Sequence, residues 1–148
     1  MTDLAGYIPE TCVRCGVPAA NWEEAIRQAG SLLQKASYLE ESYIERCIET
    51  VKEQGPYMVI AKGIALAHAR PGSDVKQEAI SVISLQNPVN FGNKDNDPVK
   101  LVFLLAALND NSHIEALMVL AQKLSEGDVR ERILQITDSK KLYEVLVK

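Results

Sequence analysis

The feature that most constrains the fold of this chain is a nearly all-apolar run over residues 99–108, interrupted only by Lys100. A strand with one face in water alternates apolar and polar residues, whereas a strand covered on both faces does not. The run therefore predicts a central strand with helices packed against both sides of its sheet. That arrangement is the layered α/β class.

Helix-start patterns and short apolar runs place the other elements. Asn21 and Glu24 form a capping box, and a Gly-Pro pair at 55–56 ends the second helix. Ser81 and Ser84 give one predicted strand a partly polar face. Besides 99–108, the predicted strands span residues 57–60, 64–67 and 79–85. The predicted helices begin at Asn21, Ser42, Ser112, Asp128 and Asp138 or Ser139.

The bulk properties favour a single domain of 148 residues, with the residues before Asn21 as an irregular extension. The net charge of −4 does not suggest a nucleic-acid partner. No apolar stretch approaches the roughly 20 residues that span a bilayer, and a signal-peptide pattern is missing. We therefore expect a cytoplasmic protein. Its oligomeric state stays open, with a homo-oligomer among the states allowed.

Three cysteines are too few to predict a disulfide framework or a metal site. Cys12 and Cys15 have the spacing of half a zinc site, but no second pair or nearby histidine completes the roughly four ligands required. We interpret both as ordinary thiols and Cys47 as a packing residue within the second helix. No metal is expected.

Both histidines of the chain lie where an element ends or begins. His68 directly follows the apolar run 64–67 and precedes Arg70, and His113 follows Ser112 at a predicted helix start. In α/β proteins, ligands and reactive groups gather beyond the carboxyl ends of the strands. The two histidines are therefore the candidate site residues.

Elimination leaves nucleophilic chemistry at His68. The chain has no Gly-x-Ser-x-Gly elbow, no Walker loop and no dinucleotide fingerprint, so no nucleotide cofactor is expected. Neutral imidazole, with an ordinary pKa of about 6.5, is the attacking form. Arg70 could donate to an attacked anion if its loop folds back. If Ser112 is the N-cap, the helix start lowers the pKa of His113 and offers amides to the anion. His113 as a mere helix-start residue is an equal alternative.

The stretch from Gly55 to Pro71, with His68 and Arg70 near its end, resembles the active-site region of phosphotransferase-system enzyme IIA domains of the fructose–mannitol type. The segment 96–99 and the helix start at His113 resemble the ascorbate-type branch of that family more closely. The resemblance covers nearly the whole chain. It implies a single α/β domain whose mixed central β-sheet is flanked by helices on both faces. It also implies that His68 is phosphorylated and that His113 supports it.

The same resemblance implies a cytoplasmic phosphocarrier without a cofactor. His68 would accept a phosphoryl group from phospho-HPr and pass it to the cysteine of a separate IIB component. That component would energise uptake of ascorbate or a related sugar or polyol through a membrane IIC component. Two alternatives stay open. One is a regulatory IIA-like protein that acts by phosphorylation-dependent partner binding, and the other is a noncatalytic module that binds an anion.

Three positions near the site need separate interpretation. The family usually has proline where this chain has Ala67, so the approach to His68 is less rigid. Mannitol-type relatives use an upstream basic residue, which Lys52 or Lys62 could match, but we interpret both as solvated lysines. The carboxylates at 95 and 97 would repel a phosphate, so they are interpreted as turn residues or partner contacts.

Overall fold

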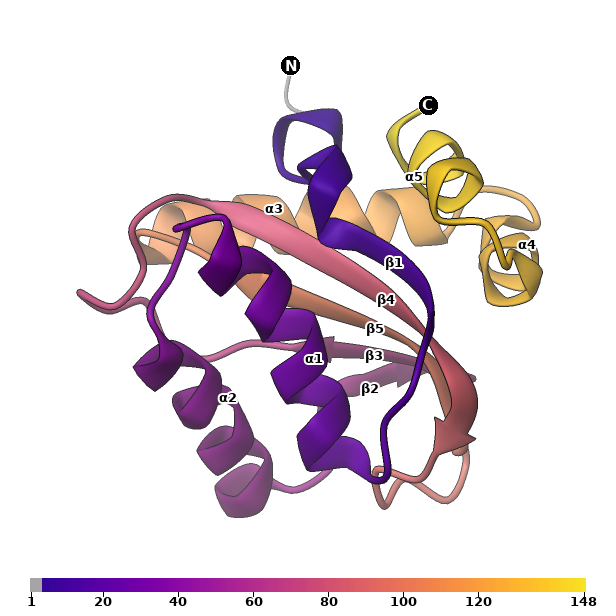
Figure 1. The fold of residues 1–148 in the computed structure, drawn as a ribbon, viewed down its shortest axis with the longest axis horizontal. Helices are drawn as coiled ribbons and strands as arrows, with labels where there is room; N and C mark the ends of the chain where they lie inside the picture. The colour runs from indigo at the N-terminus through magenta and orange to yellow at the C-terminus, as the bar shows by residue number, and fades with distance from the viewer. Residues whose placement is uncertain (1–3) are drawn as a thin grey trace.

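A five-stranded mixed sheet forms the centre of the protein in a computed structural model that describes residues 4–148 (Figure 1). The strands are β1 (Val13–Val17), β2 (Val59–Ala61), β3 (Ile64–Ala67), β4 (Ala79–Val89) and β5 (Val99–Ala106). Their order is β1-β4-β5-β3-β2, with β1–β4 and β3–β5 parallel and the other two pairs antiparallel. The helices are α1 (Trp22–Lys35), α2 (Glu41–Gln54), α3 (Asp110–Leu124), α4 (Val129–Gln135) and α5 (Ser139–Val147).

Helices cover both faces of the sheet, as predicted. α1 and α2 lie on one face, and α3, α4 and α5 lie on the other (Figure 1). Along β5, Val102 and Leu104 pack toward α1 and α2, whereas Leu101 and Phe103 pack toward α3. Because both faces of this strand are dry, its sequence shows no polar alternation. The α/β class and the mixed sheet are confirmed.

The ends of the first two helices follow the local sequence. Asn21 caps α1 by accepting the Glu24 amide at 2.9 Å, and the Glu24 carboxylate accepts the Ala20 amide at 3.1 Å. α2 ends before Gly55, whose φ of 84° suits glycine. The start of α2 differs slightly from prediction. It begins at Glu41, because the Ser42 hydroxyl donates to a loop carboxylate instead of capping the helix.

The N-terminal segment differs from the expected irregular extension. A short 3-10 turn, η1 (Leu4–Gly6), is followed by η2 (Glu10–Cys12) and by β1, which pairs in parallel with β4. The five residues of β1 include Arg14 and Gly16, so they lack a strong strand pattern. The predicted polar face of β4 is also wrong. Ser81 is fully buried beneath α1, where its hydroxyl donates to the Ala29 carbonyl at 2.7 Å.

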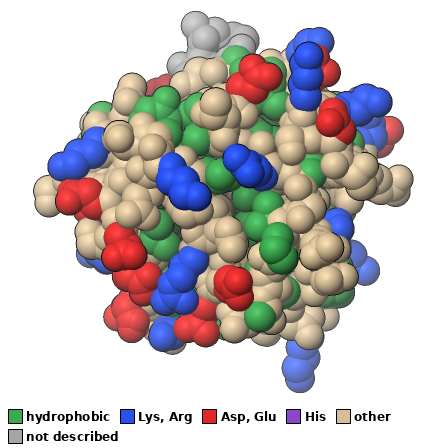
Figure 2. Space-filling model, viewed as in Figure 1, with side chains coloured by type: hydrophobic (Ala, Val, Ile, Leu, Met, Phe, Trp, Pro, Cys, Tyr) green, Lys and Arg blue, Asp and Glu red, His purple; other side chains and the backbone are tan. Residues whose placement is uncertain are grey.

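The outer surface carries charges of both signs. Acidic side chains gather over α2, toward the lower left of Figure 2, where glutamates recur at a four-residue spacing. This exposed stripe consists of Glu41, Glu45, Glu49 and Glu53. Across residues 4–148, the structure contains no helix with the length and apolar character needed to cross a bilayer.

Candidate functional site

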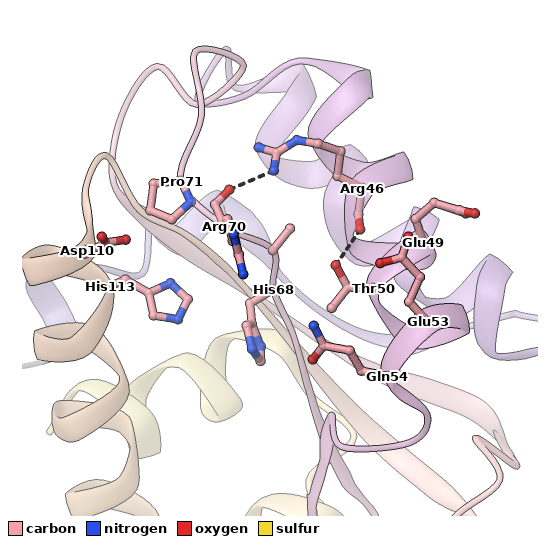
Figure 3. Close-up of a pocket in the computed structure, with 11 residues that line it drawn as sticks. Arg46, Glu49, Thr50, Glu53, Gln54, His68, Arg70, Pro71, Asp110 and His113 are labelled. Atoms are coloured by element: carbon pink, nitrogen blue, oxygen red, sulfur yellow. Dashed lines mark hydrogen bonds between the residues drawn. The ribbon is translucent and has the colours of Figure 1, made fainter.

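The two predicted site histidines meet at one edge of the sheet. β3 and β5 are parallel neighbours with Ala67 opposite Leu104, so the segments that follow them emerge together. His68 directly follows β3, and His113 lies in the first turns of α3, which follows β5. Their ring centroids are 5.3 Å apart with the ring planes at 63° (Figure 3). The two candidate residues of the sequence analysis thus lie side by side.

A backbone carbonyl fixes the tautomer of His68. The Nδ1 atom lies 3.1 Å from the carbonyl oxygen of Leu66. A carbonyl oxygen can only accept a hydrogen bond, so the proton of the neutral ring is on Nδ1. The lone pair of the ring is then on Nε2. The half-buried His68 ring therefore has one defined nucleophilic atom.

The surroundings of His113 favour its neutral form. Burial lowers its pKa, and the nearby His68 lowers it further, while Asp110 acts weakly in the opposite direction. Among residues 4–148, no hydrogen-bond partner faces the buried Nδ1 of His113. No carbonyl or carboxylate fixes its tautomer at that nitrogen. The ring can therefore carry its proton on Nε2 and offer a neutral N–H donor.

The start of α3 lies one turn earlier than predicted. Asn109 is the N-cap: its side chain accepts the Ser112 amide at 2.9 Å, and the Ser112 hydroxyl accepts the Asn109 amide at 3.2 Å. His113 is thus not the first helical residue, and its own amide donates to Asn109. Ser112 is not among the residues that line the cleft, and the capping box uses its amide and hydroxyl. The geometry offers no support for the prediction that Ser112 binds an anion.

α2, the loop after β3 and the start of α3 line a cleft of about 730 Å³ around the histidines (Figure 3). Arg70 lines this cleft. The rim also carries carboxylates, so the cleft is not uniformly basic. The lining comprises Arg46, Glu49, Thr50, Glu53, Gln54, His68, Ala69, Arg70, Pro71, Asp110 and His113.

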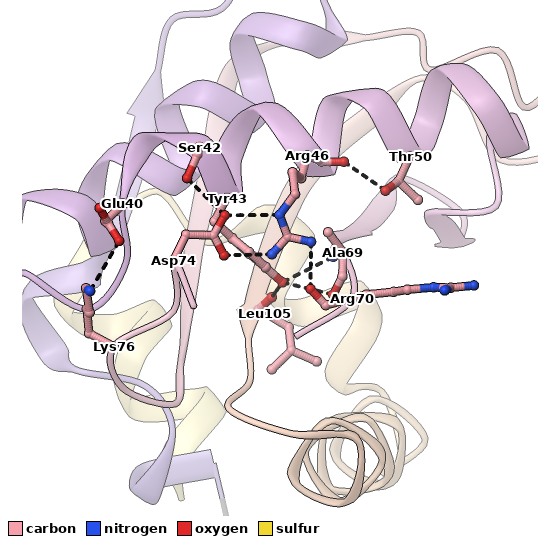
Figure 4. A network of polar contacts seen from close by, with 10 residues as sticks. All are labelled: Glu40, Ser42, Tyr43, Arg46, Thr50, Ala69, Arg70, Asp74, Lys76 and Leu105. Atoms are coloured by element: carbon pink, nitrogen blue, oxygen red, sulfur yellow. Dashed lines mark hydrogen bonds and ion pairs between the residues drawn. The ribbon is translucent and has the colours of Figure 1, made fainter. Parts of the chain in front are cut away.

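Arg46 is a basic residue that α2 contributes to the cleft, and the sequence analysis did not name it. Its guanidinium donates to both Asp74 oxygens, at 2.7 and 3.0 Å, and to the Arg70 carbonyl at 2.8 Å (Figure 4). The Arg46 guanidinium lowers the pKa of Asp74, and the Ser42 hydroxyl adds a further hydrogen bond. This network ties the loop after His68 to α2. The sequence signal for Arg46 was its place on the second predicted helix, about one turn after Tyr43.

The other candidate charges lie outside the cleft. Lys52 pairs with Glu23 at 3.4 Å, in agreement with a solvated lysine, and Lys62 is exposed. The Asp97 carboxylate accepts the amides of two preceding loop residues, at 2.9 Å each, as a turn residue does. Asp95 is exposed in the same loop.

The thiols belong to the packing of the molecule. Cys12 donates to the Leu32 carbonyl under α1, while Cys15 donates to the Ile136 carbonyl on the opposite face of the sheet. Their side chains therefore point apart. Cys47 is fully buried in the core between α2 and the sheet, as its pattern predicted.

The fold and this histidine site define an enzyme IIA component. Residues 7–148 match the model of the family "Phosphoenolpyruvate-dependent sugar phosphotransferase system, EIIA 2", and the chain belongs to that family. It is a phosphotransferase component of sugar or polyol transport. The resemblance stated from the sequence is confirmed.

Two curated relatives show the range of the family. The mannitol-specific cryptic phosphotransferase enzyme IIA component of Escherichia coli K12 is 32% identical over 143 residues, covering 97% of both chains. The ascorbate-specific IIA component of the same strain is 34% identical over 116 residues, covering 78% of this chain and 75% of the relative.

Solved structures agree with this assignment. The solution structure of the E. coli cryptic mannitol enzyme IIA superposes with a TM-score of 0.88 at 32% identity, covering 98% of each chain. A structure of E. coli mannitol enzyme IIA in complex with phosphorylated enzyme IIB superposes with a TM-score of 0.80 at 27% identity. It covers 94% of this chain and 96% of that one.

Proposed function

We propose that this enzyme IIA is a cytoplasmic phosphocarrier in which Nε2 of His68 carries the phosphoryl group. The donor is the phosphohistidine of HPr, and the acceptor is the cysteine of a separate IIB component. One observation carries the proposal: the Leu66 carbonyl holds the proton of His68 on Nδ1, at 3.1 Å, and so leaves Nε2 as the nucleophile. The His113 ring beside it is a neutral donor for the incoming group.

The transfer step needs no cofactor. The Nε2 lone pair forms a bond to phosphorus while the P–N bond of the donor histidine breaks. The electron pair of that broken bond returns to the donor imidazole nitrogen. The phosphorylated His68 ring keeps its Nδ1 proton and gains positive character. The Leu66 carbonyl, which already accepts this proton, stabilises the developing charge.

The remaining cleft residues act on the transferred group. Charge spreads over the three equatorial oxygens in the loose transition state of phosphoryl transfer, so donors and cations stabilise it. His113 supplies a neutral N–H, and Arg70, which lines the same cleft, supplies a guanidinium. Arg46 acts through the backbone, since its side chain is engaged by Asp74 and by the Arg70 carbonyl.

Onward transfer goes to a IIB component on a different chain. A complex between mannitol enzyme IIA and phosphorylated IIB supports a partner of this kind. The chain's own Cys15 is half-buried in β1, on the opposite side of the sheet from α1 and α2, and is not such an acceptor. Relatives named for mannitol and ascorbate support uptake of ascorbate or a related sugar or polyol through a membrane IIC component.

Intact-mass measurement tests the proposal. Incubation with phosphoenolpyruvate, enzyme I and HPr should add one phosphoryl group to the wild type, and acid should remove it because the bond is P–N. His68→Ala should gain none while its circular dichroism spectrum is unchanged. An adduct on His68→Ala at the wild-type rate would refute the assignment. Added IIB should discharge the wild-type adduct, whereas an adduct that no IIB discharges would favour the regulatory alternative.

A further inference from the structure

The two histidine-bearing segments diverge where the backbone pairing of β3 and β5 stops. The last paired residues are Ala67 and Leu104. Beyond them, the segment after β3 continues through His68 and Ala69, and β5 continues through Leu105 toward α3. The cleft opens at this divergence. The distance between the segments is therefore not set by ladder hydrogen bonds at the point where the histidines lie.

A tyrosine hydroxyl from α2 fills the gap. The Tyr43 oxygen accepts the Ala69 amide at 3.1 Å and lies 2.6 Å from the Leu105 carbonyl oxygen, to which it donates (Figure 4). A hydroxyl has one proton, so the longer 3.3 Å approach to the Ala69 carbonyl is secondary. The hydroxyl thus bridges the two segments in place of a direct backbone hydrogen bond. The segments are therefore further apart here than paired strands are.

Tyr43 is fixed in this position and hidden from any partner. Its side chain is 0% exposed, and the Arg46 guanidinium lies over its ring, 5.1 Å from the centroid. Burial raises the pKa of Tyr43, so its hydroxyl stays protonated and keeps its donor. A residue in this place cannot contact a docked donor protein.

We propose that Tyr43 is a positioning residue for phosphoryl transfer, whose buried hydroxyl sets the separation between the His68 and His113 segments. The inference rests on the proposed role of His68. Loss of the hydroxyl removes the hydrogen-bond partner of both the Ala69 amide and the Leu105 carbonyl. The segments must then shift, and displacements on the order of 1 Å can cost about a hundredfold in rate.

Tyr43→Phe tests this role, with Ser81→Ala as a matched control. Ser81 is also fully buried, and its hydroxyl also bonds one backbone carbonyl, but at the α1–β4 contact. Transfer from phospho-HPr is measured at a temperature where circular dichroism shows both variants folded. Tyr43→Phe should lower the maximal rate by about ten- to a hundredfold. The KM for phospho-HPr should not change, because Tyr43 touches no partner.

A second readout follows the ring itself. In ¹⁵N NMR spectra, wild-type His68 should show the Nδ1–H tautomer, and Tyr43→Phe should show a mixture or altered His68 and His113 shifts. Ser81→Ala should lose stability but keep wild-type rates and shifts. Wild-type kinetics and shifts in Tyr43→Phe, or an equal rate loss in Ser81→Ala, would overturn the inference. An unphosphorylated wild type would overturn the proposed function itself.

If Tyr43→Phe does not fold, hydrogen exchange in the wild type decides the question. The Ala69 amide lies beyond the last β3–β5 pair, so its protection depends on the Tyr43 oxygen. A protected Ala69 amide supports the link between the two segments. An Ala69 amide that exchanges as fast as exposed loop amides would overturn it.

Discussion

Asp74→Ala should destabilise the protein far more than the loss of an equally well-formed surface ion pair. The Asp74 carboxylate accepts two charged hydrogen bonds from Arg46, at 2.7 and 3.0 Å, and one from Ser42 at 3.0 Å. Its side chain is 12% exposed and that of Arg46 is 38% exposed. A hydrogen bond to a charged group is worth about 1.5–3 kcal/mol, and the half-exposed arginine recovers part of this from water. We therefore expect Asp74→Ala to lower the free energy of unfolding by about 2–3 kcal/mol.

The Arg27–Glu45 pair provides the matched control. It has the same two-bond geometry, at 3.0 and 3.2 Å, but its side chains are 49% and 51% exposed. Glu45→Ala should therefore cost only about 0.2–1 kcal/mol. Urea denaturation of both variants gives the two free energies of unfolding. Equal losses, or a loss below about 1 kcal/mol for Asp74→Ala, would contradict the reasoning from burial.

The Arg46–Asp74 pair also predicts that the stability of the protein depends on pH. The Arg46 guanidinium lowers the pKa of Asp74 in the folded protein below its value in the unfolded chain, which is about 3.9. The contribution of Asp74 is therefore fully present above about pH 4 and is lost as the pH falls through the folded-state pKa. The stability difference between wild type and Asp74→Ala should shrink in that acid range. A difference that stays constant down to pH 3 would contradict the ion-pair account.

Three further predictions concern His113 and the exposed face of α3. His113→Ala should still accept phosphate but about ten- to a hundredfold more slowly, as rapid-quench kinetics would show; wild-type rates would make it a mere helix-start residue. Because burial and His68 lower the pKa of His113, stability should fall as the pH drops below about 6.5, by at most ~1.4 kcal/mol per pH unit. His113→Gln should remove that slope in urea titrations, and an unchanged slope would exclude His113 as its source. Met118 lies one turn beyond Ile114 on α3 and is 67% exposed. Met118→Glu should therefore slow phosphoryl transfer to and from partner proteins, whereas Met118→Leu should not. Equal transfer rates for the two variants would place docking elsewhere.

The sequence predicted the parts of the site that depend on local pattern. His68 directly follows a buried strand, and that position alone places it at the sheet edge. The all-apolar run at 99–108 likewise defined the central strand and so the α/β layering. The start of α3 was misplaced because two overlapping patterns, Asn109 with Ser112 and Ser112 with Glu115, both fit a capping box. α3 begins at the earlier position because Asn109 is an equally good cap and the earlier start adds a turn of helix.

Contacts between distant segments could not be read in this way. Arg46 and Tyr43 lie on α2, and helical spacing says only which of its residues face inward. It does not say that the loop after His68 folds back and forms hydrogen bonds with both side chains. β1 was missed for a related reason: its pairing with β4 stabilises five residues whose own pattern is weak.

The most direct test of the account is which atom of the phosphorylated protein carries phosphorus. The protein, labelled with ¹⁵N in its histidine rings, is phosphorylated through enzyme I and HPr and examined by NMR for coupling between nitrogen and phosphorus. Because the Leu66 carbonyl holds the proton of His68 on Nδ1, the account predicts coupling to Nε2 of His68 and a retained Nδ1 proton. Phosphorus on Nδ1 of His68, or on His113, would contradict it.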